Sequence, residues 1–149
     1  MLGSAFAWCP RCDRGWVNLL VVAGSGISLQ VCDECDAVWP QPTPLHDGGF
    51  RDLTAVLAEI GVAPLWTSLV DPGPKAWFAH LGYRLITREG PDEVVSVDLL
   101  REGAGGQPFD AYGRGSSIEE AFESARRRWQ TEQIGSAADQ SRNSQRQLP

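Results

Sequence analysis

The chain of 149 residues lacks the features that a membrane protein or a general nucleic-acid-binding protein needs. Its longest uninterrupted apolar run extends only from Leu19 to Ala23, which is too short to span a bilayer. Nineteen Asp and Glu residues outnumber thirteen Lys and Arg residues, so the formal net charge is -6 and the isoelectric point is near 4.8. Such a charge gives no overall attraction to phosphate backbones or anionic lipids. We therefore expect no membrane association.

The chain is also poor in groups for acid–base or nucleophilic catalysis. Its two histidines are His46, which follows a Pro-rich segment, and His80, which lies in an apolar segment. No Ser or Cys stands in a nucleophile-elbow context, and no candidate base pairs with a candidate nucleophile. Gly24-Ser25-Gly26 lacks the Lys-Ser/Thr that follows a phosphate-binding loop. We predict that the protein is not an enzyme and that both histidines are packed or surface residues.

The N-terminus has neither the basic segment nor the long apolar stretch of a signal peptide. We therefore expect a cytoplasmic protein, in which disulfides are disfavoured. The cysteines Cys9, Cys12, Cys32 and Cys35 form the pattern C-x2-C-x19-C-x2-C, with none left over. This spacing is typical of a zinc site, because each tight turn directs two thiolates at one ion.

The segment between the cysteine pairs favours a β-hairpin. Residues 16–22 are rich in β-formers, residues 23–26 form a Gly-containing turn signal, and residues 27–31 alternate apolar and polar side chains. Residues 8–39, with the two C-x2-C turns and this hairpin, resemble the zinc-ribbon proteins. The resemblance implies one structural Zn²⁺ held by all four cysteines. Because four thiolates leave the site negatively charged, we expect the neighbouring Arg11 and Arg14 to soften that charge and backbone amides of the turns to donate to sulfur.

Four cysteines at this spacing are also compatible with other sites. A rubredoxin-like iron site has the same donors, but that family usually places Gly after the second Cys of each turn, where this chain has Asp13 and Asp36. Two disulfides or a thioredoxin-like redox pair are further alternatives, although a redox C-x-x-C opens a helix after a strand. Catalytic zinc is disfavoured, because four thiolates leave no position for water.

Aromatic and basic residues could contact a partner. Trp8 and Trp39 flank the cysteines, either as cover for the metal site or as a platform for bases or a partner's side chain. Arg126, Arg127 and Arg128 form either a patch for nucleic acid or an acidic partner, or a solvated helix face with Glu123–Arg127 and Arg128–Glu132 pairs.

Beyond the cysteines, prolines mark a linker over residues 40–49. Periodic apolar residues predict a helix over 50–60, begun by Asp47 or its neighbouring glycines and ended by Gly61, and a second short helix over 63–70. We expect a β-β-β-α unit over residues 75–133, with residues 77–82 as a helix or a strand. Its strands are predicted at 83–88, 94–100 and 109–113, joined by a turn at 90–92 and a loop at 102–108.

The final helix is predicted from Ser117, with a capping box in which the serine bonds forward and Glu120 bonds back. We expect it to end at Gly135 and the polar tail to be disordered. Its predicted buried stripe is Ile118, Ala121, Phe122, Ala125 and Trp129.

Residues 83–130 resemble two families of β-β-β-α domains. The strand pattern after Tyr83 and the helix entry after Gly113 are similar to double-stranded-RNA-binding domains, whose helix begins with phosphate-clamping lysines. Here that helix begins Ile118-Glu119-Glu120, which argues against RNA binding. The stretch 115–121 is also similar to the helix entry of HicB-like antitoxins, which implies a non-catalytic module that binds a protein toxin.

The sequence thus predicts an α+β protein in five parts: zinc ribbon 1–39, Pro/Gly linker 40–49, helical element 50–74, β-β-β-α domain 75–133 and disordered tail 134–149. The function we expect is a non-enzymatic, zinc-binding protein-interaction module, antitoxin- or immunity-like. The alternative is an RNA- or DNA-binding regulator that uses the ribbon and the Arg-rich helix, which the acidic charge disfavours.

Overall fold

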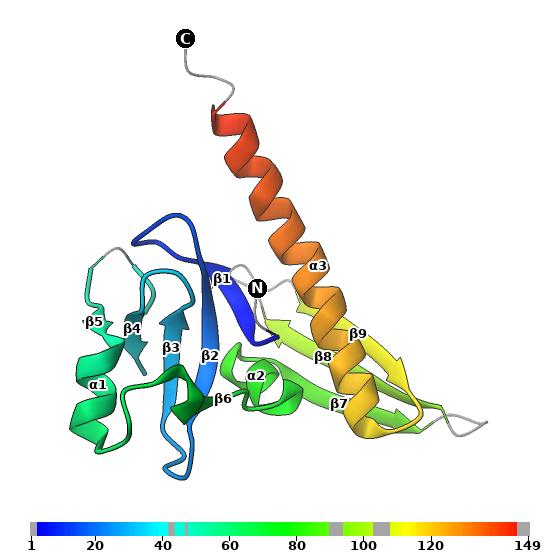
Figure 1. Ribbon diagram of the computed structural model, residues 1–149. Helices are drawn as coiled ribbons and strands as arrows, with labels where there is room; N and C mark the ends of the chain where they lie inside the picture. Colours follow the sequence, from blue (N-terminus) through cyan, green and yellow to red (C-terminus); the bar gives the residue numbers. More distant parts are fainter. Residues whose placement is uncertain (1–2, 42–43, 47, 90–93, 103–107, 146–149) are drawn as a thin grey trace. The chain divides into compact units, whose positions relative to one another are not determined.

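The computed structural model describes residues 3–41, 44–46, 48–89, 94–102 and 108–145 (Figure 1). It is a mixed α+β structure with antiparallel sheets, as the sequence predicted. The chain divides into two compact units, Met1–Pro72 and Gly73–Pro149. The expected turn at 90–92 and most of the expected loop at 102–108 lie outside the described residues. No helix in the described ranges is long and apolar enough to cross a membrane.

The N-terminal unit is built on a six-stranded antiparallel sheet. Its strands run in the order β1-β2-β3-β4-β5, and β6 pairs with β2. The strands are β1 (Ala5–Trp8), β2 (Trp16–Val22), β3 (Ser28–Cys32), β4 (Ala37–Pro40), β5 (Arg51–Asp52) and β6 (Leu69–Val70). The predicted hairpin is β2 and β3. The short strands β1, β4, β5 and β6 were not predicted, because so few residues each carry little periodic signal.

Both faces of this sheet are buried. On one face, Leu20 and Val22 of β2 pack with Val31, Val38 and residues of helix α1 (Leu53–Ile60). On the other face, β2 contributes Val17 to a second cluster, which contains the buried cysteines and Trp39. Successive side chains of a strand point to opposite faces, so a strand with two buried faces is apolar almost throughout. This is why β2 reads as a nearly continuous apolar run.

Helix α1 begins later than the sequence predicted. The expected cap was Asp47 or its neighbours, but the N-cap is Asp52, whose carboxylate accepts a hydrogen bond from the Ala55 amide at 3.2 Å. Arg51 and Asp52 pair with β4 as strand β5, so the helix begins only after them. Gly61 ends the helix as predicted, in the left-handed conformation with φ of 86°.

The short helix expected over residues 63–70 was wrong in part. Only a 3₁₀ turn forms, at Trp66–Ser68, and the chain then continues as strand β6. The Ser68 hydroxyl donates to the Ala63 carbonyl at 2.7 Å, which closes a turn instead of an α-helix. Leu69 is drawn into the sheet by pairing with Val22 of β2.

The C-terminal unit contains two helices and a three-stranded antiparallel sheet of order β7-β8-β9. Its elements are α2 (Pro74–His80), β7 (Arg84–Glu89), β8 (Val95–Glu102), β9 (Pro108–Gly115) and α3 (Ile118–Gln145). The segment 77–82, which the sequence left open between helix and strand, is largely helical. Trp77 and Phe78 of α2 are 0% and 1% exposed and belong to the interior of this unit.

Helix α3 packs against strand β9 in the C-terminal unit (Figure 1). A Cβ atom placed on Gly113 would collide with the Ala121 carbonyl oxygen and the Ala125 backbone nitrogen. Gly113 and the two alanines are buried, so small side chains on both elements permit this approach. Ile118 was wrongly predicted in the buried stripe, because it is 44% exposed.

At the start of α3, only one of the two hydrogen bonds of the predicted capping box forms. The Ser117 hydroxyl accepts from the Glu120 amide at 3.2 Å, as predicted. The Glu120 carboxylate bonds back to the amide of Ser116 at 2.8 Å, one residue earlier than expected. It also accepts from the Ser116 hydroxyl. These bonds lower the pKa of Glu120.

The prediction that α3 ends at Gly135 was wrong, because the helix continues to Gln145. A glycine inside a helix costs about 1 kcal/mol relative to alanine, and it ends the helix only where the backbone turns left-handed. Residues 134–145 were expected in a disordered tail and are instead helical, while 146–149 lie outside the described residues.

Candidate metal centre

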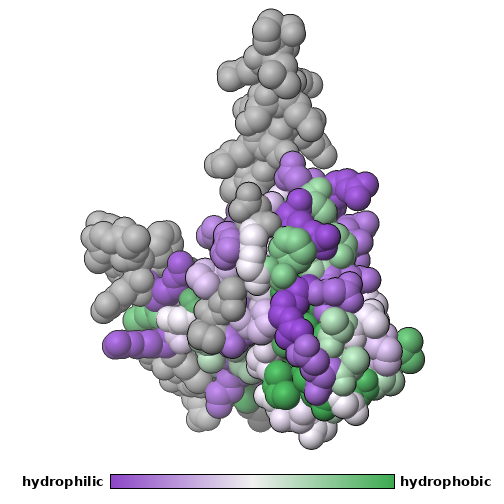
Figure 2. Space-filling view, turned by 90° about the vertical axis from the view of Figure 1, so that its left-hand side faces the viewer, coloured by the Kyte–Doolittle hydropathy of each residue, from purple (hydrophilic) through white to green (hydrophobic). Residues whose placement is uncertain are grey.

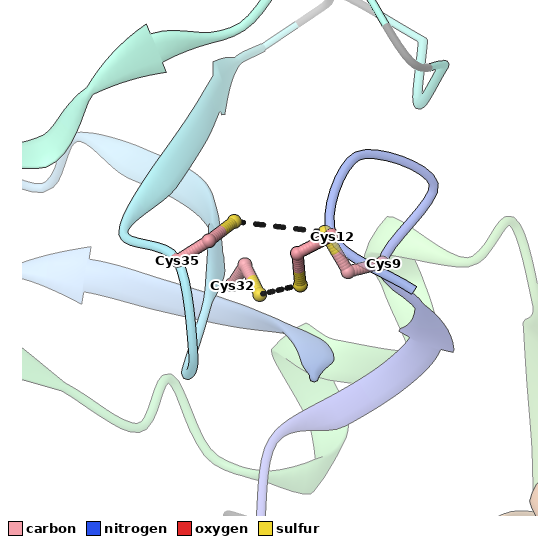
Figure 3. A group of neighbouring side chains, drawn as sticks. All are labelled: Cys9, Cys12, Cys32 and Cys35. Atoms are coloured by element: carbon pink, nitrogen blue, oxygen red, sulfur yellow. Dashed lines mark hydrogen bonds between the residues drawn. The ribbon is translucent and has the colours of Figure 1, made fainter. Parts of the chain in front are cut away.

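The four cysteines occupy two equivalent turns of the N-terminal sheet. Cys9 and Cys12 lie in the turn between β1 and β2. Cys32 is the last residue of β3, and Cys35 lies in the turn between β3 and β4. Because β2 pairs with β3 and Val17 lies opposite Cys32, the two turns meet at one end of the sheet. Figure 3 shows the four side chains converging from these two turns.

The sulfur geometry fits a tetrahedral metal ion. All four Sγ atoms lie within 4.8 Å of one another. The Cys9–Cys35 and Cys12–Cys32 separations are 3.8 Å and 3.7 Å. A tetrahedron with metal–sulfur bonds of about 2.3 Å has sulfur–sulfur edges of about 3.8 Å. The four donors could therefore hold one ion with little rearrangement.

Both turns end in the same backbone conformation. Asp13 and Asp36, the residues that follow the second cysteine of each turn, have φ of 52° and 55°. This left-handed region favours glycine but also tolerates aspartate. The sequence predicted zinc over iron partly because Gly is missing at these two positions. Since the aspartates adopt the conformation that glycine would supply, their presence does not distinguish zinc from iron.

Aspartate carboxylates fix these turns in place. Asp13 accepts a hydrogen bond from the Trp8 indole at 2.6 Å, and Asp36 accepts one from the Trp66 indole at 3.1 Å. The repetition at both turns was not predicted. The sequence signal was an aspartate directly after each C-x2-C, but Trp66 lies thirty positions from Asp36 and only the fold joins them.

Gly15 makes room for the second cysteine pair, a role that the sequence analysis missed. A Cβ atom at this position would lie 2.8 Å from the Cys32 sulfur and 2.7 Å from Glu34 side-chain carbons. Real Cβ atoms essentially never approach other heavy atoms below 3.0 Å. The turn between β1 and β2 therefore passes close to Cys32 only because residue 15 has no side chain.

Backbone amides of the turns donate to sulfur, as expected. The Glu34 amide lies 3.4 Å from the Cys32 sulfur, and amides of Arg11 and Cys12 act on Cys9 in the same way. Burial nevertheless raises the pKa of Cys9 and of Cys32. For Cys12, burial is outweighed by hydrogen bonds, first from the Arg14 amide, and its pKa is lowered. A metal ion binds the deprotonated sulfur, so its binding releases protons from the cysteines.

The two tryptophans that were predicted as possible partner contacts differ in exposure. Trp39 is 0% exposed, and its indole N–H donates to the carbonyls of His46 and Gly48 at 3.0 Å and 3.1 Å. It therefore belongs to the core and cannot be a stacking platform on the surface. Trp8 is 37% exposed and packs edge-on against Trp16, with ring centroids 4.6 Å apart.

The three arginines of α3 do not form one surface patch. Arg126 is 5% exposed and pairs with Glu123 at 2.8 Å, which corrects both the patch and the solvated-face interpretations for this residue. Arg127 is exposed and lies 3.8 Å from Glu123, as the i, i+4 prediction required. Arg128 lies over the Tyr112 ring, 5.3 Å from its centroid.

Neither histidine joins the cysteines. The His46 ring nitrogen Nδ1 accepts from the Gly48 amide at 3.1 Å. His80 is half-buried at the end of α2, and burial lowers its pKa. Among the described residues, the four cysteines are the one group of His, Cys, Asp or Glu side chains that could hold a metal ion.

Comparison with known proteins identified no relative of this chain. A scan against protein-family models and searches of curated proteins and solved structures found no match for this chain. The four-cysteine cluster is compatible with a zinc-ribbon-like site on its own geometry.

Proposed function

We propose that Cys9, Cys12, Cys32 and Cys35 bind one structural Zn²⁺ and that residues 8–39 are a zinc ribbon. The observation that carries this proposal is the mutual approach of the four sulfur atoms within 4.8 Å. Four thiolates complete the coordination of zinc and leave no site for water, so the ion stabilises the fold and performs no reaction. Binding of zinc to small modules contributes on the order of 10 kcal/mol to folding.

A comparison of two glycine variants tests this site. Gly15→Ala pushes a methyl group against the Cys32 sulfur. Gly24→Ala adds the same methyl group with nothing within 4 Å and, because Gly24 has φ of 77°, strains the backbone of a turn that holds no cysteine, so it controls for strain that does not reach the sulfurs. We expect purified wild-type protein and Gly24→Ala to contain one zinc per chain by elemental analysis, and Gly15→Ala to retain less. Replacement by Co²⁺ should give the visible spectrum of a tetrathiolate centre. A cobalt spectrum that indicates an oxygen ligand would contradict the closed site.

We further propose that the protein is a non-enzymatic module that binds a partner protein, as an antitoxin or an immunity protein does. The closed donor set and the net charge of -6 support this class over catalysis and over polyanion binding. Exposed apolar side chains in the N-terminal unit offer contact area to a protein: Trp8, Ile27, Leu65 and Val70. Figure 2 shows hydrophobic residues exposed among hydrophilic ones on the face that it draws.

The start of α3 favours a protein partner over nucleic acid. Glu119 and Glu120 are exposed in the first turn, where an RNA-binding helix would carry lysines. Arg126 is buried, so it cannot contact phosphates. Titration of labelled RNA and DNA duplexes at low salt should give no binding. Binding that weakens with salt and is lost in Arg127→Glu would favour the alternative.

Affinity capture from the native cell tests the protein partner. Trp8→Ala removes the exposed aromatic residue of the N-terminal unit, and Ile118→Ala removes an exposed apolar residue of the C-terminal unit as a control. We expect the zinc-loaded wild type and Ile118→Ala to recover the same specific protein, and Trp8→Ala to recover less. Zinc content is measured in each variant, so that loss of fold is separated from loss of contact. Recovery of nucleic acid alone would contradict the proposal.

A further inference from the structure

A small, mostly enclosed cavity lies in the C-terminal unit, between strand β9 and residues 128–133 of α3. Its volume is about 150 Å³. Aromatic and polar side chains line it, chiefly Tyr83, Tyr112, Arg128, Trp129, Glu132 and Gln133. None of these residues belongs to the metal centre, and the proposed function makes no use of them.

The aromatic walls of the cavity are held in fixed orientations. The Trp129 indole donates to the Tyr83 hydroxyl at 2.8 Å and packs edge-on against Trp77, with ring centroids 4.9 Å apart. Tyr83 in turn packs edge-on against Phe78 at 5.4 Å. Because Trp77 and Phe78 are buried, these contacts fix the positions of the Trp129 and Tyr83 rings in the cavity wall before any ligand binds.

The size and the lining of the cavity match one aromatic ring. An apolar cavity of about 150 Å³ is large enough to hold benzene. Aromatic side chains favour offset or edge-on contact with another ring, which adds to the gain from apolar burial. Tyr83, Tyr112 and Trp129 can provide such contacts, whereas an aliphatic chain of the same volume would gain only the burial.

The charge beside the cavity is positive. The Arg128 guanidinium is exposed and lies over the Tyr112 ring, 5.3 Å from its centroid. A second guanidinium, that of Arg114, lies 5.6 Å from the same ring centroid. Glu132 also lines the cavity, but it already has an interaction partner. A guanidinium binds a carboxylate through two parallel hydrogen bonds, so the complementary ligand carries a carboxylate.

We propose that this cavity binds a single aromatic ring that bears a carboxylate. The ring lies among Tyr83, Tyr112 and Trp129, and the carboxylate pairs with Arg128. Two sources supply this chemistry: a free aromatic acid, or a polypeptide that ends in an aromatic residue. Benzoate represents the first source, and the peptide Gly-Gly-Phe represents the second.

The binding experiment uses the zinc-loaded full chain labelled with ¹⁵N. The indole N–H of Trp129 lies at the cavity wall, and its NMR signal is assigned by comparison with Trp129→Phe. We expect benzoate or the peptide to shift this signal saturably, with a Kd on the order of 1 mM or tighter. Benzamide keeps the ring but lacks the charge and should bind about tenfold or more weakly. The tighter of the two acidic probes identifies the source.

Two arginine variants test whether benzoate binding depends on the guanidinium at the cavity or on any nearby positive charge. Arg128→Gln removes the guanidinium at the cavity and should weaken benzoate binding about tenfold or more. Arg127→Gln removes the neighbouring, exposed arginine, which lies at Glu123 and not at the cavity, and should bind as the wild type does. Two results would overturn the proposal: no saturable shift by either probe up to about 10 mM, or equal benzoate affinity in wild type and Arg128→Gln.

Discussion

The two units of the molecule differ in what fills their interiors. In the N-terminal unit, six short strands and one helix of eight residues carry a four-sulfur cluster at one end of the sheet. In the C-terminal unit, a longer helix packs on three strands over aromatic side chains. The first unit contains strands of only two to seven residues, and isolated hairpins of that size are marginal in water. The second buries Trp77, Phe78 and Phe122 in one interior. From this difference we expect the first unit to depend on the proposed metal ion for much of its stability, and the second unit to depend on its own side chains.

The largest expected effect is unfolding of the N-terminal unit alone, caused by loss of a single sulfur donor. Cys12→Ser removes one of the four donors, and we expect loss of the metal and unfolding of the N-terminal unit, since structural zinc contributes on the order of 10 kcal/mol. Amide hydrogen exchange should show protection lost in residues 3–41 and retained in strands β7–β9. Arg14→Ser, in the same turn, is the control and should keep its metal. Retained metal and unchanged protection in Cys12→Ser would refute the assignment.

Removal of a buried aromatic side chain from the C-terminal unit should destabilise that unit alone. Trp77 is fully buried and packs against Phe78 and Trp129, with both centroid distances 4.9 Å. Trp77→Ala should cost about 3–5 kcal/mol in the free energy of unfolding. Denaturant titration should show one transition shifted and zinc content unchanged. If the metal is lost as well, the two units are not independently stabilised.

A smaller effect is expected at the start of α3. Ser117→Ala removes the hydroxyl that accepts from the Glu120 amide and should cost about 1 kcal/mol. Thermal unfolding of the C-terminal unit gives the measurement. Ser124→Ala, in the interior of the same helix, serves as the control. A cost equal in both variants would show that the cap contributes nothing specific.

The weakest predicted effect is a pH dependence confined to the C-terminal unit. Burial holds the pKa of His80 below its usual value of 6.5, so the unfolded chain binds a proton more readily than the folded one. The free energy of unfolding should therefore fall as the pH falls through about 6.5 towards the lower folded value. Denaturant titrations at about pH 7.5 and about pH 5.5 measure this difference, which His80→Gln should reduce.

The sequence predicted the features that depend on neighbouring residues. The hairpin of residues 16–32 and the four-cysteine group follow from local spacing, because each C-x2-C turn and the strand pairing that joins them are short-range. The start of α3 at Ser117 is likewise a local signal.

Features that depend on distant contacts were not predictable in the same way. Trp39 and Arg126 are types often found at binding surfaces, yet tertiary packing buries both. Gly135 is a helix-stop signal, but the backbone there stays helical within α3. Asp36 accepts a hydrogen bond from Trp66, which lies thirty positions further along the chain. In each case, the deciding partner lies far along the chain or in a neighbouring element.

Strand β2 divides its side chains between two interiors, with Val17 beside the cysteines and Leu20 and Val22 beneath helix α1. A fragment that stopped at residue 39, at the end of the expected ribbon, would keep every sulfur but leave the α1-facing side of β2, β3 and β4 without its cover. Such an uncovered apolar surface promotes aggregation. The smallest soluble piece that carries the metal should therefore extend to Pro72, and shorter expression fragments should precipitate even when zinc is supplied.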